Sequence, residues 1–176
     1  MSAVIIPAVH KLRLFDLAGR RNGCKHPSWS RRASDIFTDH EVDYIGLKGE
    51  YAVCKHFGTR IDQRIHSHGD AGHDLTLPDG RRAMVKFNHR VRGYFMIERE
   101  RDFSAPVGVS VYGECDPPRT CLCRDMGRAD RVMIGGWISR EQFFRVCRKT
   151  DWGLGPRWYV PQWLLSPVAV LSPPPL

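Results

Sequence analysis

The clearest hydrophobic pattern is a helical one that ends at Phe57. Small or apolar residues recur at the spacing of one helical face, at positions 42, 45, 49, 52 and 53. Acidic residues crowd the first turns, Ser34 or Asp39 can cap the start, and Gly58 is a natural stop. The pattern predicts a helix that begins near Ser34 or Asp35 and ends at Phe57.

Further along the chain, several short segments alternate apolar and polar residues or are rich in β-branched residues, which is typical of strands. The turn signal Pro78-Asp79-Gly80 separates the first two. The predicted strands are 74–77, 82–88, 94–98, 107–112 and 131–138. A second helix is predicted over 140–147, with Ser139 as its cap. This order predicts an α/β (α+β) fold with a mixed central sheet of about five strands, flanked by helices.

The two ends of the chain are less regular. Residues 3–17 fit a short strand or a helix, and residues 19–34 are rich in Gly, Ser, Pro and Arg, which predicts a loop or linker. In the tail from residue 152, aromatic residues separated by Gly and Pro predict a short strand and a turn. We therefore divide the chain into a basic arm or linker at 1–33, a domain at 34–171 and a flexible tail at 172–176.

Charge is unevenly distributed along the 176 residues, a length that predicts about one domain. The chain carries 27 Lys and Arg against 19 Asp and Glu, a formal net charge of +8. Within residues 1–33, seven Lys and Arg face only Asp16. This excess indicates an arm for a polyanion, and a solvated leader is the alternative.

The sequence shows neither the pattern of a membrane span nor that of a secretory signal. The sequence has no unbroken stretch of about 18 apolar residues. It also has no Lys or Arg before its first apolar stretch, which disfavours a secretory signal. We expect a cytoplasmic protein, in the host cytoplasm if a phage encodes it.

Cysteine spacing offers a weak case for zinc. Cys115, Cys121 and Cys123 share one loop, but structural zinc usually takes pairs spaced two to four residues apart, and the last two are closer than that. Reduced loop cysteines are favoured, and a zinc-stabilised interaction protein is kept as an alternative.

The densest polar signal consists of three segments, Gly46–Glu50, Gly69–Asp74 and Met84–Asn88. A carboxylate at the start of one strand and a lysine across the hairpin can converge at one end of a sheet. Carboxylate oxygens suit Mg²⁺ or Mn²⁺, and a nearby lysine can position the attacking water and offset charge in the transition state.

In this order the segments resemble the PD-(D/E)XK nuclease superfamily, which has the restriction-endonuclease-like fold. The resemblance is to its bacterial and phage-type members. The resemblance covers about residues 40–171. Gly46–Glu50 is similar to the Gly-x-x-Gly-Glu helix of the family, and Gly69–Asp74 to its Gly-Asp-x-Gly-x-Asp stretch. Met84–Lys86 stands where the family has an acid-x-Lys strand. Two later segments, 135–141 and 160–167, are also similar.

The resemblance implies a function and a role for each matching residue. It implies metal-dependent hydrolysis of phosphodiester bonds, and DNA is favoured over RNA as the nucleic acid. Asp74 would be the main ligand of Mg²⁺ or Mn²⁺. Glu50 would be the helix acid that holds the site or binds a second metal ion, and Asp70 would be an auxiliary acid. Lys86 would be the catalytic lysine.

One position departs from the family pattern. Met84 stands where the acid is expected, and a thioether is a poor ligand for Mg²⁺. Asn88 or Glu98 could supply a replacement ligand. The alternative is an impaired pseudonuclease that serves as a DNA-binding or partner-binding module.

Arginines near the site and in the arm are the predicted DNA contacts, and they are Arg20, Arg21, Arg31, Arg32, Arg90 and Arg92. For the pair beside the hairpin, a charged strand edge is an equal alternative. Four histidines lie in the same region, His66, His68, His73 and His89. We interpret them as hydrogen-bonding side chains in preference to a metal site.

Overall fold

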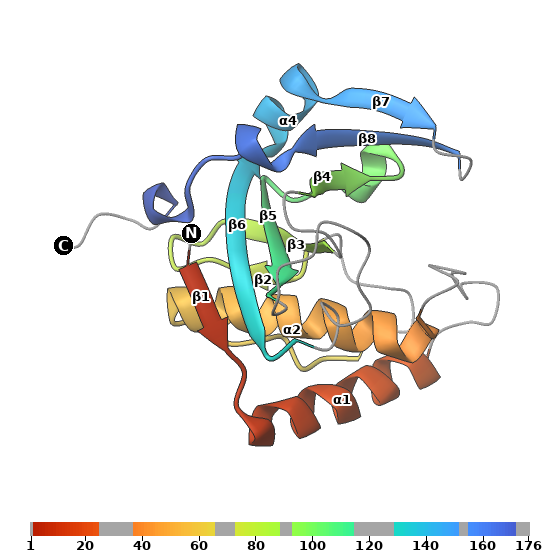
Figure 1. Cartoon of the computed structure of the whole chain (residues 1–176), viewed down its shortest axis with the longest axis vertical. Helices are drawn as coiled ribbons and strands as arrows, with labels where there is room; N and C mark the ends of the chain where they lie inside the picture. Colours follow the sequence, from red (N-terminus) through yellow and green to blue (C-terminus); the bar gives the residue numbers. More distant parts are fainter. Residues whose placement is uncertain are drawn as a thin grey trace.

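The computed structural model describes residues 2–24, 37–65, 73–88, 93–114, 129–151 and 155–171. These residues form three layers (Figure 1). Helices α1 (Ala8–Gly23) and α2 (Asp39–Phe57) make the first layer. A five-stranded sheet is the middle layer, and a three-stranded sheet with helix α4 (Arg140–Val146) lies on its other side.

The middle sheet confirms the predicted fold class, a mixed sheet of five strands flanked by helices. Its strands, in spatial order, are β1 (Ser2–Ile5), β6 (Arg131–Ser139), β5 (Val107–Gly113), β3 (Arg82–Asn88) and β2 (Leu75–Thr76). Strands β3 and β5 are parallel and the other neighbours are antiparallel. The restriction-endonuclease-like assignment of this core stays a prediction.

The membership of the sheet differs from the prediction at two strands. The strand β4 (Tyr94–Ile97) leaves the middle sheet and pairs with β8 (Pro156–Pro161), which in turn pairs with β7 (Arg148–Asp151). The vacated fifth position is filled by β1, which pairs with β6. Alternation of apolar and polar residues indicates a half-buried strand, but it does not specify which strand it pairs with.

The N-terminal residues belong to the packed structure. Helix α1 runs to Gly23, past the predicted loop start at Gly19, and buries Leu14, Leu17 and Ala18 in the first core. Of the predicted arm, residues 2–24 thus form a strand and a helix of the fold. The predicted boundary at residue 33 and the tail at 172–176 lie outside the described residues.

Helix α2 ends as predicted but begins at a different cap. Thr38 is the N-cap: its Oγ1 accepts a hydrogen bond from the Glu41 backbone N–H at 3.2 Å, and the Glu41 side chain accepts one from the Thr38 N–H. This reciprocal capping box satisfies two backbone donors, which explains why Asp39 is the first helical residue and not the cap. Gly58 ends the helix at φ 68°.

Two hydrophobic cores hold the layers together. The first lies between the helices and the middle sheet, and there Gly49 brings α2 close to Val85 and Val111. The second lies between the two sheets and contains Met84 and Phe95. No helix among the described residues has the length and apolar character needed to cross a membrane.

Lys48 is a fully buried cation on α2. Its ammonium donates a hydrogen bond to the Ala129 carbonyl oxygen at 2.7 Å and lies 5.3 Å from the centroid of the Tyr44 ring. Burial lowers the pKa of Lys48 from 10.5 to about 8. An unfolded chain therefore holds this proton up to a higher pH than the folded one.

The sign of this shift predicts a pH dependence of stability. Between pH 8 and 10.5 the unfolded state binds more protons at Lys48, so the free energy of unfolding should rise with pH. We expect the contribution of Lys48 to the free energy of unfolding to grow by about 2 kcal/mol from about pH 8 to about pH 10. Urea denaturation measures it as the difference between the wild type and Lys48→Met, which lacks this contribution.

Lys149→Met, at an exposed lysine on β7, is the matched control and should keep the gain. The pKa of the Cys54 thiol is raised by burial from 9.0 to about 11, which opposes the gain from about pH 9 upward. That contribution is common to all three proteins and cancels in the difference. A wild-type curve parallel to that of Lys48→Met would contradict the prediction.

Candidate functional site

Asp74 is held against β3 by two hydrogen bonds. Its backbone N–H donates to the Ala83 carbonyl oxygen at 2.9 Å, and its carboxylate Oδ2 accepts from the Val85 backbone N–H at 2.6 Å. Because β2 is only two residues long, the carboxylate supplies the next rung of the ladder in place of a backbone carbonyl. The Asp74 carboxylate thus contacts the residue that precedes Lys86 in β3.

Alternate residues of β3 face different layers. Val85 and Phe87 pack on the first core beside α2, whereas Met84 packs in the second core. The two-residue period places Lys86 and Asn88 on the face of Met84, away from α2. Both side chains are half-buried.

Ser110 of β5 joins this polar row. It is fully buried, pairs in register with Lys86, and its Oγ accepts a hydrogen bond from Asn88 Nδ2 at 2.6 Å. Ser110 was not among the site residues predicted from the sequence. A lone hydroxyl inside the valine-rich segment 107–111 was the available signal, because a buried polar group needs a partner.

Glu50 lies apart from this row. It is buried on α2, on the opposite side of β3 from Lys86, and its Oε1 is 3.4 Å from Arg21 Nη1 on α1. This ion pair joins the two helices, which points to a structural role for Glu50. Its predicted role as a metal ligand has no support in this contact.

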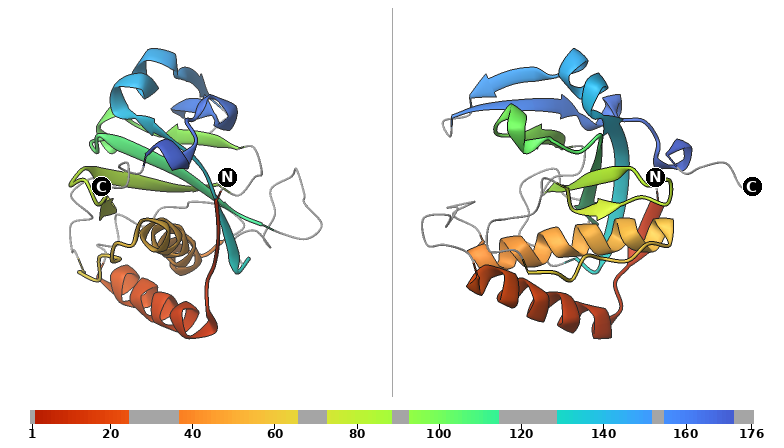
Figure 2. Two further views of the ribbon diagram at one scale, coloured as in Figure 1. Left: turned by 90° about the vertical axis from the view of Figure 1, so that its left-hand side faces the viewer. Right: turned by 180° about the vertical axis from the view of Figure 1, so that it is seen from behind.

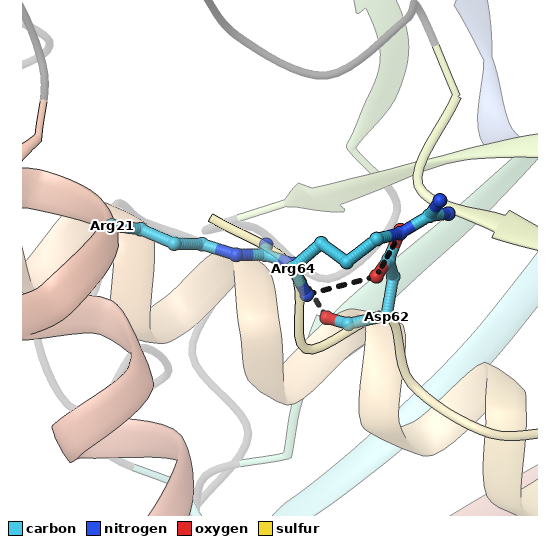
Figure 3. A network of polar contacts seen from close by, with 3 residues as sticks. All are labelled: Arg21, Asp62 and Arg64. Carbon is cyan, nitrogen blue, oxygen red and sulfur yellow. Dashed lines mark hydrogen bonds and ion pairs between the residues drawn. The ribbon is translucent and has the colours of Figure 1, made fainter. Parts of the chain in front are cut away.

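Arg21 also anchors the segment that follows α2, as Figure 3 shows. Its Nη2 donates to the Asp62 carbonyl oxygen at 2.6 Å, and the Asp62 carboxylate in turn pairs with Arg64 at 2.9 Å. Arg21 was predicted to contact DNA, but its guanidinium is turned inward onto these partners. Arg20, its neighbour, is exposed.

Each of the two predicted replacement ligands has a partner, although the amide oxygen of Asn88 takes no part in its hydrogen bond. The Asn88 amide donates to Ser110, and the exposed Glu98 forms an ion pair with Arg157 of β8 at 3.3 Å. Met84 itself is 5% exposed and surrounded by apolar side chains. None of the three supplies a carboxylate beside Asp74.

A polar atom without a partner lies next to Asp74. Nδ1 of His73 is buried and accepts or donates no hydrogen bond in the part of the chain that the structure describes. In the same part, His, Cys, Asp and Glu do not gather in groups of three or more that could hold a metal.

Several predicted site residues lie outside the described residues, namely Asp70, Arg31, Arg32, Arg90, Arg92 and the cysteines 115, 121 and 123. Among the described cysteines, Cys24 is exposed and Cys54 is buried. The raised pKa of Cys54 keeps it a neutral thiol at neutral pH.

Comparison with protein-family models, with curated proteins and with solved structures finds no match to this chain.

Proposed function

We propose that the chain is a metal-dependent nuclease that hydrolyses DNA phosphodiester bonds, with Asp74 as the metal ligand and Lys86 as the catalytic lysine. The observation that carries the proposal is the 2.6 Å hydrogen bond from the Val85 N–H to the Asp74 carboxylate. It fixes the Asp74 carboxylate on the backbone of β3, at the residue that precedes Lys86. The resemblance in motif order to the PD-(D/E)XK superfamily supports the same reading.

The residues present suit a hard cation with few protein ligands. Mg²⁺ commonly binds through one or two carboxylates, with waters and substrate phosphate completing its shell. Asp74 would be the carboxylate, and the unsatisfied Nδ1 of His73 marks a place beside it where a water can be bound. Met84 would contribute nothing. The metal, Mg²⁺ or Mn²⁺, would supply charge stabilisation for the phosphoryl group.

Lys86 would act on the substrate directly. Its ammonium, on the same strand face as Asn88, would hold a phosphate oxygen or orient the attacking water and offset the charge that develops in the transition state. Asn88 and Ser110 would fix the neighbouring polar surface through their hydrogen bond. Glu50 would act only by holding α2 against α1.

A second candidate is the impaired nuclease that binds DNA or a protein partner without cutting. The observation that favours it is the burial of Met84 in the second core. An apolar side chain packed there removes an oxygen ligand and fills the space that a ligand would need.

The test is cleavage of plasmid and of single-stranded DNA with Mg²⁺ and with Mn²⁺. Asp74→Asn keeps an oxygen that can accept from Val85 but removes the charge, and Lys86→Met keeps the length of the side chain. Each should lower the cleavage rate by about 100-fold or more. Asp79→Asn, an acid in the same hairpin turn, is the control and should cut like the wild type.

The outcomes separate the two candidates. Cleavage that persists in Asp74→Asn contradicts the proposed site. A wild-type protein that shifts DNA on a gel but does not cut it with either metal supports the second candidate.

A further inference from the structure

A cleft opens on the helical side of the molecule, between α1, α2 and the segment that follows α2. Its cavity volume is about 790 Å³. In Figure 2 that segment runs back beside the two helices. The residues that line the cleft include four cationic side chains, those of Arg13, Arg20, Lys55 and Arg60. Asp16 is the one carboxylate in the lining.

The four cations have no neutralising partner within the described part of the chain. All are exposed, and none forms an ion pair with another described residue. Cations elsewhere in the molecule do pair, as Lys11 does with Asp130 at 2.7 Å and Arg145 with Glu141 at 2.6 Å. A concave surface on which charges of one sign outnumber the other, here four cations against Asp16, attracts a counter-ion. The cleft therefore favours an anionic ligand.

The walls of the cleft are held by internal bonds. Arg21 ties α1 to the Asp62 carbonyl oxygen and to Glu50 on α2, as drawn in part in Figure 3. The Thr59 N–H donates to the Cys54 carbonyl oxygen at 2.9 Å, which fixes the start of the third wall. The cations therefore project from backbone whose spacing is set by the fold, so binding needs little reorganisation of the chain.

An aromatic surface lies in the same cleft. The His10 and Tyr51 rings line it, and their centroids are 5.0 Å apart with planes inclined by 40°. Both side chains are half-buried. Aromatic faces beside cations suit a ligand that alternates flat bases with phosphates, because bases stack on the rings and the cations contact the backbone.

We infer that this cleft binds a single nucleic-acid strand, with phosphates on the four cations and a base against the His10–Tyr51 surface. The helical layer lies on the opposite side of the middle sheet from the Lys86 face (Figure 1), so this is a second site, separate from the Asp74–Lys86 pair. Binding there requires no metal and no cleavage. The inference thus stands whether or not the proposed nuclease activity does.

The test is fluorescence anisotropy of a labelled oligo-dT strand in buffer with EDTA, which prevents cleavage. Lys55→Glu with Arg60→Glu reverses two cleft charges. The matched control reverses two exposed arginines of the opposite layer, Arg101→Glu with Arg148→Glu, and changes net charge by the same amount. Thermal melting checks that both variants are folded.

The cleft variant should bind at least about 10-fold more weakly than the wild type. The slope of its log Kd against log salt concentration should be smaller by about 1.4, because two phosphate contacts are lost and each contributes about 0.7. The control should stay within about twofold of the wild type. Equal losses in the two variants would show a general charge effect and overturn the site.

Two further arms test the identity of the ligand. A polyglutamate chain of equal charge should compete poorly, and competition as strong as that of the oligo-dT would overturn a nucleic-acid ligand. A duplex of the same length should bind more weakly. Tighter binding of the duplex would overturn the inference that the ligand is single-stranded. Because binding is measured in EDTA, where no cleavage takes place, failure of the proposed nuclease activity would leave this inference untouched.

Discussion

Replacing Met84 with glutamate is expected to lower the free energy of unfolding by about 3 kcal/mol or more in metal-free buffer, and Mn²⁺ is expected to restore part of the loss. Met84 is 5% exposed and packs in the second core with Phe95 and Phe103. A carboxylate there loses its hydration and gains no cation among these neighbours. Burial of this charge is sufficient to destabilise the fold.

The expected rescue by metal follows from the position of Asp74. One step beyond the Leu75–Ala83 pair, Asp74 lies across from Met84, and its carboxylate already contacts β3. A glutamate at 84 would therefore place two carboxylates side by side, and they would repel each other until a divalent cation binds between them. A ligand that binds only the folded state raises its stability.

Urea denaturation with and without millimolar Mn²⁺ measures both effects. Met84→Leu conserves volume and polarity, so it should cost less than about 1.5 kcal/mol and show no response to metal. Adding Asp74→Asn to Met84→Glu should abolish the response. A glutamate variant that Mn²⁺ does not stabilise would mean that the Asp74 region cannot hold a metal, and it would count against the proposed nuclease.

Alanine at Gly49 and alanine at Gly46 are expected to change stability in opposite directions, although both lie in the interior of α2. A Cβ on Gly49 would meet Val111 Cγ2 at 2.8 Å and Val85 Cγ1 at 3.3 Å. These atoms belong to the first core, where Val111 is fully buried and cannot yield without disturbing the sheet. We expect Gly49→Ala to lower the free energy of unfolding by about 2 kcal/mol.

Gly46 is the matched control three residues earlier. A Cβ there meets no atom within 4 Å. Alanine favours the helix over glycine, so Gly46→Ala should raise stability by about 0.5–1 kcal/mol. Thermal or urea denaturation of the two variants checks both signs. A stabilising Gly49→Ala would mean that α2 does not approach the sheet at this position.

The candidate site was foreseen from the sequence in part. The turn at Pro78-Asp79-Gly80 and the flanking strands place Asp74 opposite β3 through local geometry, and the structure has that arrangement. The grouping of Glu50 with Asp74 and Lys86 rested on motif order. Motif order does not specify on which side of the sheet a helix packs, and α2 lies on the side away from Lys86.

The cleft was beyond sequence reasoning for a similar reason. Arg20 was singled out as one of a run of basic residues, but Lys55 and Arg60 were not, because they lie more than 30 positions away in the chain. Only the packing of α1 against α2 brings these three charges to one surface.

By itself, the sequence determined the elements that depend on neighbouring residues: the strand 82–88, the end of α2 at Gly58 and the Ser139 cap of α4. Capping, turn geometry and side-chain period act over a few residues, so they can be read locally. The tertiary structure decided that β1 takes the place expected of β4, that Met84 is buried and that Glu50 pairs with Arg21. Strand partners, burial and ion pairs depend on segments distant in the chain, and their free energies are settled only when the layers pack.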